Sequence, residues 1–425
     1  MANAIVKVQG SPGAQPTLLG QMAPRIPTGG KIRPGDAGLG NEIQGSAGLA
    51  GVFIEGENAD DNRIAGNLIA VDDMVLESQL LSRDQILIDN RAGLNVGLGG
   101  ITIGLHGLAI AAAAAIGGWA GRALALGALV SYELEISGRR QWIRRLLPTS
   151  EGRNAVGWIA SRGPRRATLV VVAHHDAART GLIWHPALIQ GGAKRRLARH
   201  AVDPTGAPLA AGALAAATGT KVGRAIGGAV GAATVAAMID VQRSPTVPGA
   251  SDNATGVAAM LALGRRLAAD PPEGLEVVLV APGCEESGMG GMAAFLRRHG
   301  QELDPASTFV LGLDTLGAGE PILARAEGGL LPHAYRDEDN DLVDAGARAA
   351  GLPVPDRWRI GAYTDPILAV FAGLPAVSLL SIGPNGNYTN YHWPTDLPEH
   401  VDWGSVERCL DLAEAAAREF ARRAA

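Results

Sequence analysis

Aromatic residues, cysteines and surplus basic charge are all scarce in this chain of 425 residues. Phe, Trp and Tyr make up 4% of it, and Cys284 and Cys409 are its two cysteines. Two cysteines cannot build a disulfide framework, and their spacing fits no cysteine-based zinc motif. The fold must therefore be stabilised by its hydrophobic core, without disulfide bonds or cysteine-bound zinc. With 47% hydrophobic residues, the chain suits one large domain or about two to three smaller ones.

Two further absences exclude whole classes of function and targeting. The formal net charge is −5, and no window combines a basic stripe with interleaved aromatic residues, so we expect no nucleic-acid partner. The first 30 residues also lack a basic segment followed by an apolar run, which is the pattern of a secretory signal. Classical secretion from this start is therefore not expected.

The first part of the chain divides into two segments. Residues 1–90 are rich in Gly, Pro and Asn and keep almost no period of 2 or 3.6, so we interpret them as an extension of uncertain order. Residues 91–151 form an apolar helical segment and a linker, because Ala92 to Gly121 carry no formal charge and a further apolar run reaches Tyr132.

Two interpretations of the apolar regions at 92–132 and 206–239 stay open. One is a soluble helical pair buried on itself, in a cytoplasmic protein. The other is membrane association, because the first region is long enough to span a bilayer and Gly and Ala suit close helix packing in lipid. Basic clusters at 138–145 and 193–199 flank these regions. If the helices insert, the positive-inside rule places the following domain on the cytoplasmic face.

From residue 152 onward, short apolar runs alternate with amphipathic stretches. The runs at 167–173, 275–281, 308–313 and 374–381 read as buried strands. Helices are predicted at 254–268, 288–299, 341–350, 364–372 and 404–424. This alternation predicts an α/β fold, a three-layer sandwich with a mostly parallel central sheet, to which the Ala/Gly-rich helical segments are added. In such sheets, sites gather at the carboxyl ends of the strands.

Side chains able to bind metal follow the predicted strands. His174 and Asp176 come directly after the first strand, Glu285 and Glu286 after the second, and Asp314 after the third. Each has a plainer interpretation as a loop residue. The adjacent pair Glu285 and Glu286 is harder to explain in that way, because two carboxylates at the end of a buried strand repel each other unless cations or protons lie between them.

Two more candidate residues lie outside these strand ends. Asp252 stands at the start of a helix, where an N-cap is the alternative role, and His392 lies in a turn-rich loop after the last strand. Imidazole together with carboxylates suits zinc, cobalt or manganese, and one shared carboxylate can hold two such ions. The joint pattern therefore predicts a dinuclear hydrolytic site.

Five motifs carry a resemblance to a known family. In order, AHHD, PGASDNATG, GCEESG, LDTLG and YHWPTD resemble the motifs of metallopeptidase family twenty-eight, the co-catalytic zinc aminopeptidases and their carboxypeptidase relatives, over residues 152–425. The resemblance implies a zinc-peptidase-like fold and two Zn²⁺ ions, with other divalent metals as an alternative. It implies that one zinc is bound by His174 and Asp314, the other by Glu286 and His392, and both by Asp252.

The resemblance also implies catalytic roles. Glu285 is the general base and acid, Tyr391 stabilises the oxyanion, and Asp176 is the partner of His174. The implied function is a zinc-dependent exopeptidase, and above all an aminopeptidase that removes N-terminal residues from peptides. Two alternatives stay open: a glutaminyl-cyclase-like transferase, which uses one zinc, and a non-catalytic receptor-like membrane module.

Two features depart from the family pattern. An insertion at 181–248 separates His174 from Asp252 and enters beside the predicted site, so a lid, a membrane-resting element or a docking surface is expected there. The second departure is Asp365, which precedes a proline where relatives often carry an Asp-His pair. Asp365 suits a free amine and Arg179 a free carboxylate, so aminopeptidase and carboxypeptidase activities are not separated by the sequence.

Overall fold

The computed structural model describes residues 6–10, 41–45, 87–89, 99–147, 152, 154–190, 193–201 and 204–424. Most of the predicted extension at 1–90 lies outside these residues. Within it, strands β1 (Val6–Gly10) and β2 (Asn41–Gly45) pair in parallel with each other. Strand β3 (Leu87–Asp89) joins the edge of the central sheet.

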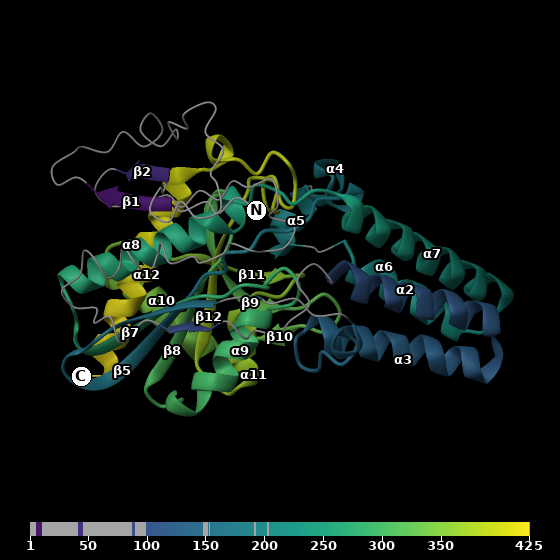
Figure 1. Cartoon of the computed structure of the whole chain (residues 1–425), viewed down its shortest axis with the longest axis horizontal. Helices are drawn as coiled ribbons and strands as arrows, with labels where there is room; N and C mark the ends of the chain where they lie inside the picture. The colour runs from purple at the N-terminus through teal and green to yellow at the C-terminus, as the bar shows by residue number, and fades with distance from the viewer. Residues whose placement is uncertain are drawn as a thin grey trace, which may run out of the picture.

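A mixed sheet forms the centre of the molecule (Figure 1). Its other strands are β4 (Asn154–Ile159), β5 (Arg162–Val172), β6 (His200–Ala201), β7 (Glu273–Ala281), β8 (Thr308–Leu313), β9 (Glu320–Glu327), β10 (His333–Ala334), β11 (Asp356–Ile360) and β12 (Ala376–Ile382). The order is β3-β4-β7-β5-β8-β12-β9-β11-β6, with β10 on β9. Strands β7, β5, β8 and β12 are parallel, whereas β4 and β9 run antiparallel to β7 and β12.

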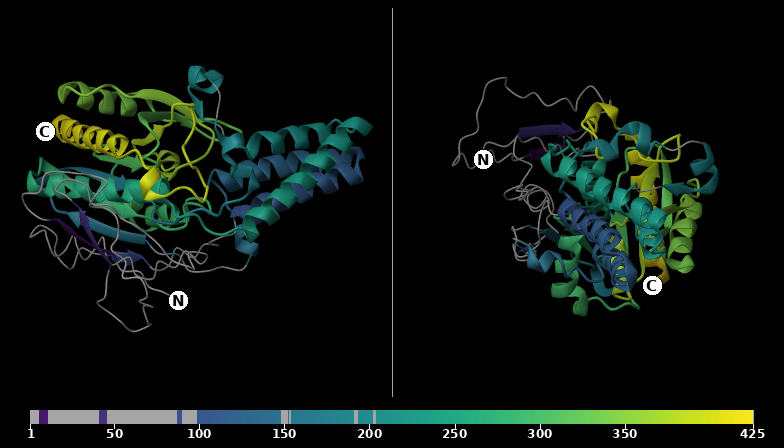
Figure 2. Two further views of the ribbon diagram at one scale, coloured as in Figure 1. Left: turned by 90° about the horizontal axis from the view of Figure 1, so that it is seen from above. Right: turned by 90° about the vertical axis from the view of Figure 1, so that its right-hand side faces the viewer.

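Helices cover both faces of this sheet (Figures 1 and 2). Alternate side chains of β5 point to opposite faces. Leu169 and Val171 belong to a core shared with α8 (Thr255–Ala269), α10 (Asp337–Ala349) and α12 (Trp403–Ala424). Val170 and Val172 belong to a second core shared with α9 (Gly290–His299) and α11 (Pro366–Phe371). The predicted α/β sandwich with a mostly parallel centre is confirmed.

The insertion at 181–248 adds to two parts of the molecule. It supplies the edge strand β6, which pairs with β11, and the short helices α4 (Pro186–Ile189) and α5 (Ala193–Ala198). It also supplies α6 (Gly206–Ala217) and α7 (Lys221–Arg243). Short helical turns elsewhere in the structure are η3 (Arg144–Leu146), η4 (Leu182–Trp184), η5 (Ala250–Ala254), η6 (Gly300–Glu302) and η7 (Pro398–His400).

Four helices project from the sheet as a bundle (Figures 1 and 2). Helices α2 (Gly99–Ile116) and α3 (Gly118–Ile136) form one hairpin, and α6 and α7 form the other. The apolar region at 92–132 is thus divided at Gly117 and Gly118, whose φ angles of 64° and 59° allow a tight turn. Among the described helices, α7 is long and apolar enough to cross a membrane, with 23 residues and a mean hydropathy of 1.5.

Glycines allow the bundle helices to approach closely. A Cβ atom added to Gly231 of α7 would lie 2.5 Å from the carbonyl oxygen of Gly107 in α2. A Cβ added to Gly227 would lie 2.8 Å from the carbonyl oxygen of Gly212 in α6. Both distances are too short for a real side chain, so glycine is required where α7 crosses its two neighbours.

This packing predicts opposite effects for two Gly→Ala changes in α7. Alanine favours a helix over glycine by about 0.5–1 kcal/mol, so Gly228→Ala, whose new atom would lie 3.7 Å from Ala114, should keep or raise the thermal midpoint. Gly231→Ala should lower it, because α7 must move away from α2. Thermal unfolding of the two purified variants measures the difference. Equal midpoints would contradict the close approach.

Candidate metal centre

The predicted metal ligands converge at the carboxyl ends of the central strands. His174 follows β5, Glu286 follows β7 and Asp314 follows β8. Asp252 lies in η5, just before α8, and His392 lies in the loop after β12. Parallel neighbouring strands end at the same edge of a sheet, and this brings residues far apart in the sequence together.

Asp252 stands between the two imidazoles. Its Oδ1 atom lies 3.3 Å from Nε2 of His174, and its Oδ2 atom lies 3.2 Å from Nε2 of His392. Asp314 Oδ2 lies 3.6 Å from Nε2 of His174, and Glu286 Oε2 lies 3.2 Å from Nε2 of His392. The five residues therefore form two groups that share Asp252, and the ligand atoms of each group lie within 4.8 Å of one another.

The donor atoms fit divalent cations. Imidazole nitrogen and carboxylate oxygen are ordinary zinc ligands, and each group offers both. Glu286 Oε1 is buried and has no hydrogen-bond partner among the described residues. A buried carboxylate oxygen without a partner is costly unless a cation is bound, so the residues present fit a metal site.

The electrostatics of the cluster point the same way. Burial raises the pKa of Glu285 well above its usual range, with a further contribution from the Glu286 carboxylate, and burial raises the pKa of Asp314 to about 6. Burial alone would lower the pKa of His392, but the carboxylates of Glu286 and Asp252 raise it to about 10. The raised pKa values of these carboxyl groups indicate that the cluster lacks positive charge, which divalent cations would supply.

Asp176 holds the loop that carries the two glutamates. Its Oδ1 and Oδ2 atoms accept hydrogen bonds from the backbone N–H groups of Glu285 and Glu286, each at 3.1 Å. His174 Nδ1 lies 3.0 Å from the carbonyl oxygen of Asp176 and 3.6 Å from its carboxylate. Asp176 therefore supports His174 chiefly through its carbonyl, while its carboxylate positions the loop after β7. Nothing in the sequence indicated this second role of Asp176.

Asp396 is a positioning residue that the sequence interpretation missed. Its carboxylate accepts hydrogen bonds from the backbone N–H groups of Ser251 at 2.8 Å and Asp252 at 3.1 Å. Asp396 belongs to the YHWPTD motif, so the motif itself was the available signal. The contact fixes the loop that holds the shared ligand, although the two segments are far apart in the sequence.

Aromatic rings enclose the imidazole of His392. Tyr391 stacks on it with ring centroids 3.9 Å apart, and Trp184 contacts it edge-on at 4.5 Å. Tyr391 thus lies beside the second group of ligands, where its predicted role towards the oxyanion stays a prediction. Trp184, from the insertion, was not predicted as a site residue, and its contact with His392 is one of packing.

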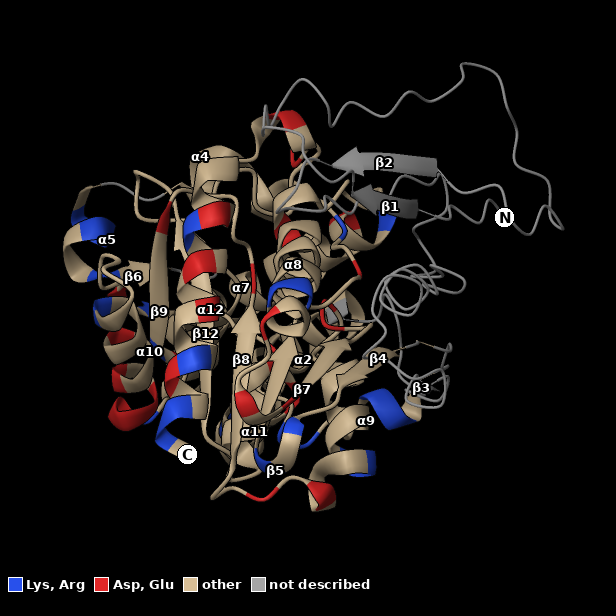
Figure 3. Ribbon diagram, turned by 90° about the vertical axis from the view of Figure 1, so that its left-hand side faces the viewer, with Lys and Arg blue, Asp and Glu red and all other residues tan. Residues whose placement is uncertain are grey.

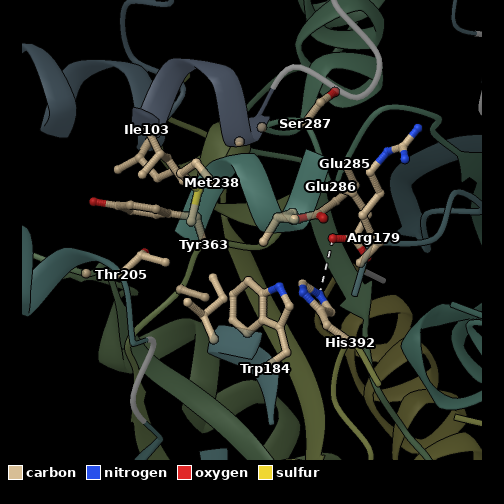
Figure 4. Close-up of a pocket in the computed structure, with 18 of the residues that line it drawn as sticks. Ile103, Arg179, Trp184, Thr205, Met238, Glu285, Glu286, Ser287, Tyr363 and His392 are labelled. Atoms are coloured by element: carbon tan, nitrogen blue, oxygen red, sulfur yellow. Dashed lines mark ion pairs between the residues drawn. The ribbon is translucent and has the colours of Figure 1, made fainter. Parts of the chain in front are cut away.

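A cleft opens beside the ligands (Figure 4). Glu285 and Glu286 line it, and so does Arg179, whose guanidinium donates to the carbonyl oxygens of Gln242 and Ser244. The opposite wall comes from the bundle and is mainly apolar; among its residues are Ile103, Tyr132, Ile136, Met238 and Val241. The cleft is thus formed where the bundle meets the sheet.

Asp365 is buried near this cluster. Both of its carboxylate oxygens lack a hydrogen-bond partner among the described residues. Burial raises its pKa well above the usual range, and the neighbouring Asp176 and Asp314 carboxylates add to the effect. Asp365 therefore adds to the acidic character of the site without being one of the grouped ligands.

Fold and site together define an α/β protein with a candidate centre for two metal ions. The model described as Peptidase family M28 matches residues 230–417, a segment that contains Asp252, Glu286, Asp314 and His392. This segment, which makes up less than half of the chain, is similar to that peptidase family, and His174 lies before it. No curated protein sequence matches the chain significantly.

Solved structures similar to this chain include aminopeptidases and a glutaminyl cyclase. An aminopeptidase from Aneurinibacillus sp. strain AM-1 is 16% identical, with 63% of this chain and 48% of that chain covered and a TM-score of 0.40. A zinc aminopeptidase from Bacillus subtilis is 17% identical, with 64% of this chain and 50% of that chain covered and a TM-score of 0.41. A glutaminyl cyclase from an Acidobacteriales bacterium is 14% identical, with 75% of this chain and 95% of that chain covered and a TM-score of 0.44. The chain spans about half the length of the two aminopeptidases.

The role of Asp396 can be tested by Asp396→Asn, which replaces one of its two accepting oxygens by a donor. The variant should bind zinc about 10- to 100-fold more weakly, because partners that orient ligands contribute on this scale. Competition with a zinc chelator measures the affinity. Asp411→Asn, a half-exposed position on α12, is the control. Unchanged zinc affinity in a folded Asp396→Asn protein would remove this positioning role.

Proposed function

We propose that the protein is a zinc-dependent aminopeptidase with two metal ions. The observation that carries the proposal is Asp252, whose two oxygens face the two His-carboxylate groups, with Glu285 beside them in the cleft. The family consists mostly of metallo-exopeptidases and also includes glutaminyl cyclases. Similarity to this family over residues 230–417 makes peptides the expected substrates.

The charge of the cleft supports recognition of a free amine. Glu285 lines the cleft and the buried Asp365 lies near the metal-binding cluster, and neither is one of the five predicted ligands, so their carboxylates are available to attract the ammonium group of a peptide N-terminus. Arg179, which could have recognised a carboxylate, donates to two backbone carbonyls of the segment after α7. This balance favours an aminopeptidase over a carboxypeptidase.

The protein groups have separate tasks in this mechanism. Bound zinc supplies Lewis-acid polarisation of the scissile carbonyl and makes a water molecule more acidic. The Glu285 carboxylate takes the proton of the attacking water and returns it to the leaving amine. Asp176 fixes the backbone of Glu285, so that its carboxylate is held at the cleft. Tyr391 remains the proposed donor to the developing oxyanion.

The ligand set argues against both alternative functions. A glutaminyl-cyclase-like transferase needs one zinc, whereas this chain presents two groups of ligands joined by a shared aspartate. A receptor-like module without chemistry has no need to keep ligands, and all five predicted ligands are present and close together. Hydrolysis with two ions uses every one of these residues.

The test combines metal analysis with Glu285→Gln. The parent protein should hold about two zinc equivalents and cleave aminoacyl anilides, and chelation should abolish cleavage. Glu285→Gln should keep the zinc and lose about 10²- to 10⁴-fold in kcat, because general acid-base catalysis contributes on this scale. Elemental analysis and initial rates measure the two properties.

The matched control is Glu276→Gln, a surface glutamate on β7 that pairs with Arg165. It should leave zinc content and turnover unchanged. Two zinc equivalents without anilide cleavage, but with cyclisation of N-terminal glutaminyl peptides, would favour the transferase. No stoichiometric metal after reconstitution would refute the catalytic proposal.

The apolar wall of the cleft predicts a preference for large apolar N-terminal residues. Met238 lies in this wall, opposite the glutamates (Figure 4). Met238→Asp should lower kcat/KM for leucyl and phenylalanyl anilides about 10-fold or more relative to the alanyl anilide, because a lost apolar contact costs about 1–3 kcal/mol. Ile239→Asp, the exposed neighbour, should change the ratio little. A uniform loss across all substrates would contradict this wall as a specificity pocket.

A further inference from the structure

The four bundle helices carry almost no charge along their length. The segments 99–121, 123–132, 206–220 and 225–239 contain no Asp, Glu, Lys or Arg. By contrast, such residues are spread over helices α5, α9, α10 and α12 around the sheet (Figure 3). Within the described residues, long helical segments without charge thus lie in the part of the molecule that projects from the sheet.

Large apolar side chains on this bundle point outward. Val130, near the middle of α3, is 61% exposed. The polar His106 is instead buried, with Nδ1 2.7 Å from the carbonyl oxygen of Thr102 and Nε2 2.9 Å from Oγ of Ser131. This is the reverse of a water-exposed bundle, where polar groups face out. The other exposed apolar residues of the four helices include Leu105, Leu108, Leu124, Leu126, Leu214 and Ile226.

The far end of the bundle combines aromatic, apolar and basic side chains. Trp119 is 83% exposed and Val222 is 70% exposed. The guanidinium of Arg122 donates to the carbonyl oxygen of Thr218, and that of Arg224 donates to the carbonyl oxygens of Ala114 and Ala115. These hydrogen bonds satisfy carbonyl groups at the ends of α2 and α6, which would otherwise face the surroundings.

The near end, beside the sheet, repeats this combination. Trp142 and Leu146 are exposed there, next to the exposed Arg139, Arg140 and Arg145. Trp and basic residues are enriched where helices leave a bilayer. A protein partner covering the bundle would not require such residues at both of its ends.

Helices α7 and α2 come close to the thickness of a membrane, whereas α6, with 12 residues, rises about 18 Å. Helix α7 rises about 24 Å from Arg224 to Asp240, and the 18 residues of α2 rise about 27 Å, against about 30 Å for the hydrocarbon core of a bilayer. The close glycine contacts between α7 and its neighbours also suit helix association in lipid, where small residues let backbones approach.

We propose that α2, α3, α6 and α7 insert into a lipid bilayer, with the turns at Gly117 and Gly219 on the far side and the peptidase domain at the near surface. The cleft, at the junction of bundle and sheet, then opens next to the membrane surface. The basic residues of 138–145 and 193–199 outnumber Arg122, Lys221 and Arg224 at the far end. By the positive-inside rule, the peptidase domain is on the cytoplasmic side.

The first test is flotation of the full chain with vesicles of phosphatidylethanolamine and phosphatidylglycerol. The protein should float with the vesicles and resist extraction at alkaline pH. Leu108→Glu combined with Val130→Glu should reduce the floating fraction about 10-fold, because a charged side chain is costly at the bilayer centre. Val354→Glu, at an exposed apolar position of the peptidase domain, is the control and should float normally. Circular dichroism in detergent verifies that the variants fold.

The second test uses single exposed cysteines and does not depend on a variant that weakens insertion. Cys284 and Cys409 are buried, so the parent chain should not react with a membrane-impermeant maleimide. Val222→Cys reports on the far end and Arg140→Cys on the near end. In one batch of sealed vesicles, the fractions labelled without detergent should be complementary. In intact cells the reagent does not reach the cytoplasm. Arg140→Cys, at the cytoplasmic near end, should therefore stay unlabelled, and Val222→Cys, at the far end, should be labelled.

Three outcomes would overturn the proposal. If the fractions of Val222→Cys and Arg140→Cys labelled without detergent in sealed vesicles add up to well above one, the bundle does not cross the bilayer. Absence of flotation, together with a stable oligomer in detergent-free buffer, would mean that a second copy of the chain covers the bundle. Labelling of Arg140→Cys alone in intact cells would reverse the orientation. None of these readouts requires peptidase activity, so they stand apart from the proposed function.

Discussion

The rest of the site depends on how Asp252 is held between the imidazoles of His174 and His392. Carboxylates outnumber positive groups in this buried cluster, so it is stable only with protons or cations in place. The protein fixes the aspartate through its neighbours in the chain. Asp396 accepts hydrogen bonds from two backbone N–H groups here, and the Asn253 side chain donates to the carbonyl oxygen of Leu313 and accepts from the N–H of Thr315. Asp252, the predicted shared ligand, is thereby linked both to the loop of His392 and to the end of β8.

The parallel centre of the sheet explains why two groups of ligands can form at all. Strands β7, β5 and β8 are neighbours, and each ends with a ligand or with the loop that carries one. Asp176 connects the first two of these ends, because its carboxylate binds the backbone after β7 while its own backbone follows β5. A change at one strand end therefore reaches the others through hydrogen bonds as well as through charge. Such a connected set of buried polar contacts is strong when it is complete and costly when one member is lost.

The sequence was sufficient to predict the sheet centre and to select candidate ligands that lie close together, and it was insufficient where position depends on distant backbone. Strands β5, β7, β8 and β12 are buried on both faces, so they read as apolar runs, and the ligands directly follow such runs or stand in motifs. Strands β9 and β11 carry charged residues within them and gave no comparable signal. Asp396 was missed because its role is to accept N–H groups from a segment 145 positions away. The composition of residues 92–132 predicted an apolar helical segment. It did not predict that the chain reverses direction at Gly117, because that turn depends on backbone angles that hydrophobicity does not encode.

The bundle contacts the loop of the proposed general base in more places than the wall of the cleft. Glu135, at the end of α3, lies 3.3 Å from the buried guanidinium of Arg144, and a Cβ atom on Gly288 would lie 2.5 Å from that same guanidinium. Gln141 also donates to the carbonyl oxygen of Gly288, at 2.6 Å. Gly288 closes the turn that begins at Glu285, since its N–H donates to the Glu285 carbonyl oxygen.

A displacement of α3 would therefore move Arg144 against the turn that holds the proposed general base. Because a buried ion pair broken on one side costs about 3–5 kcal/mol, this junction resists such movement. The bundle thus shapes the cleft and at the same time keeps the proposed general base in place.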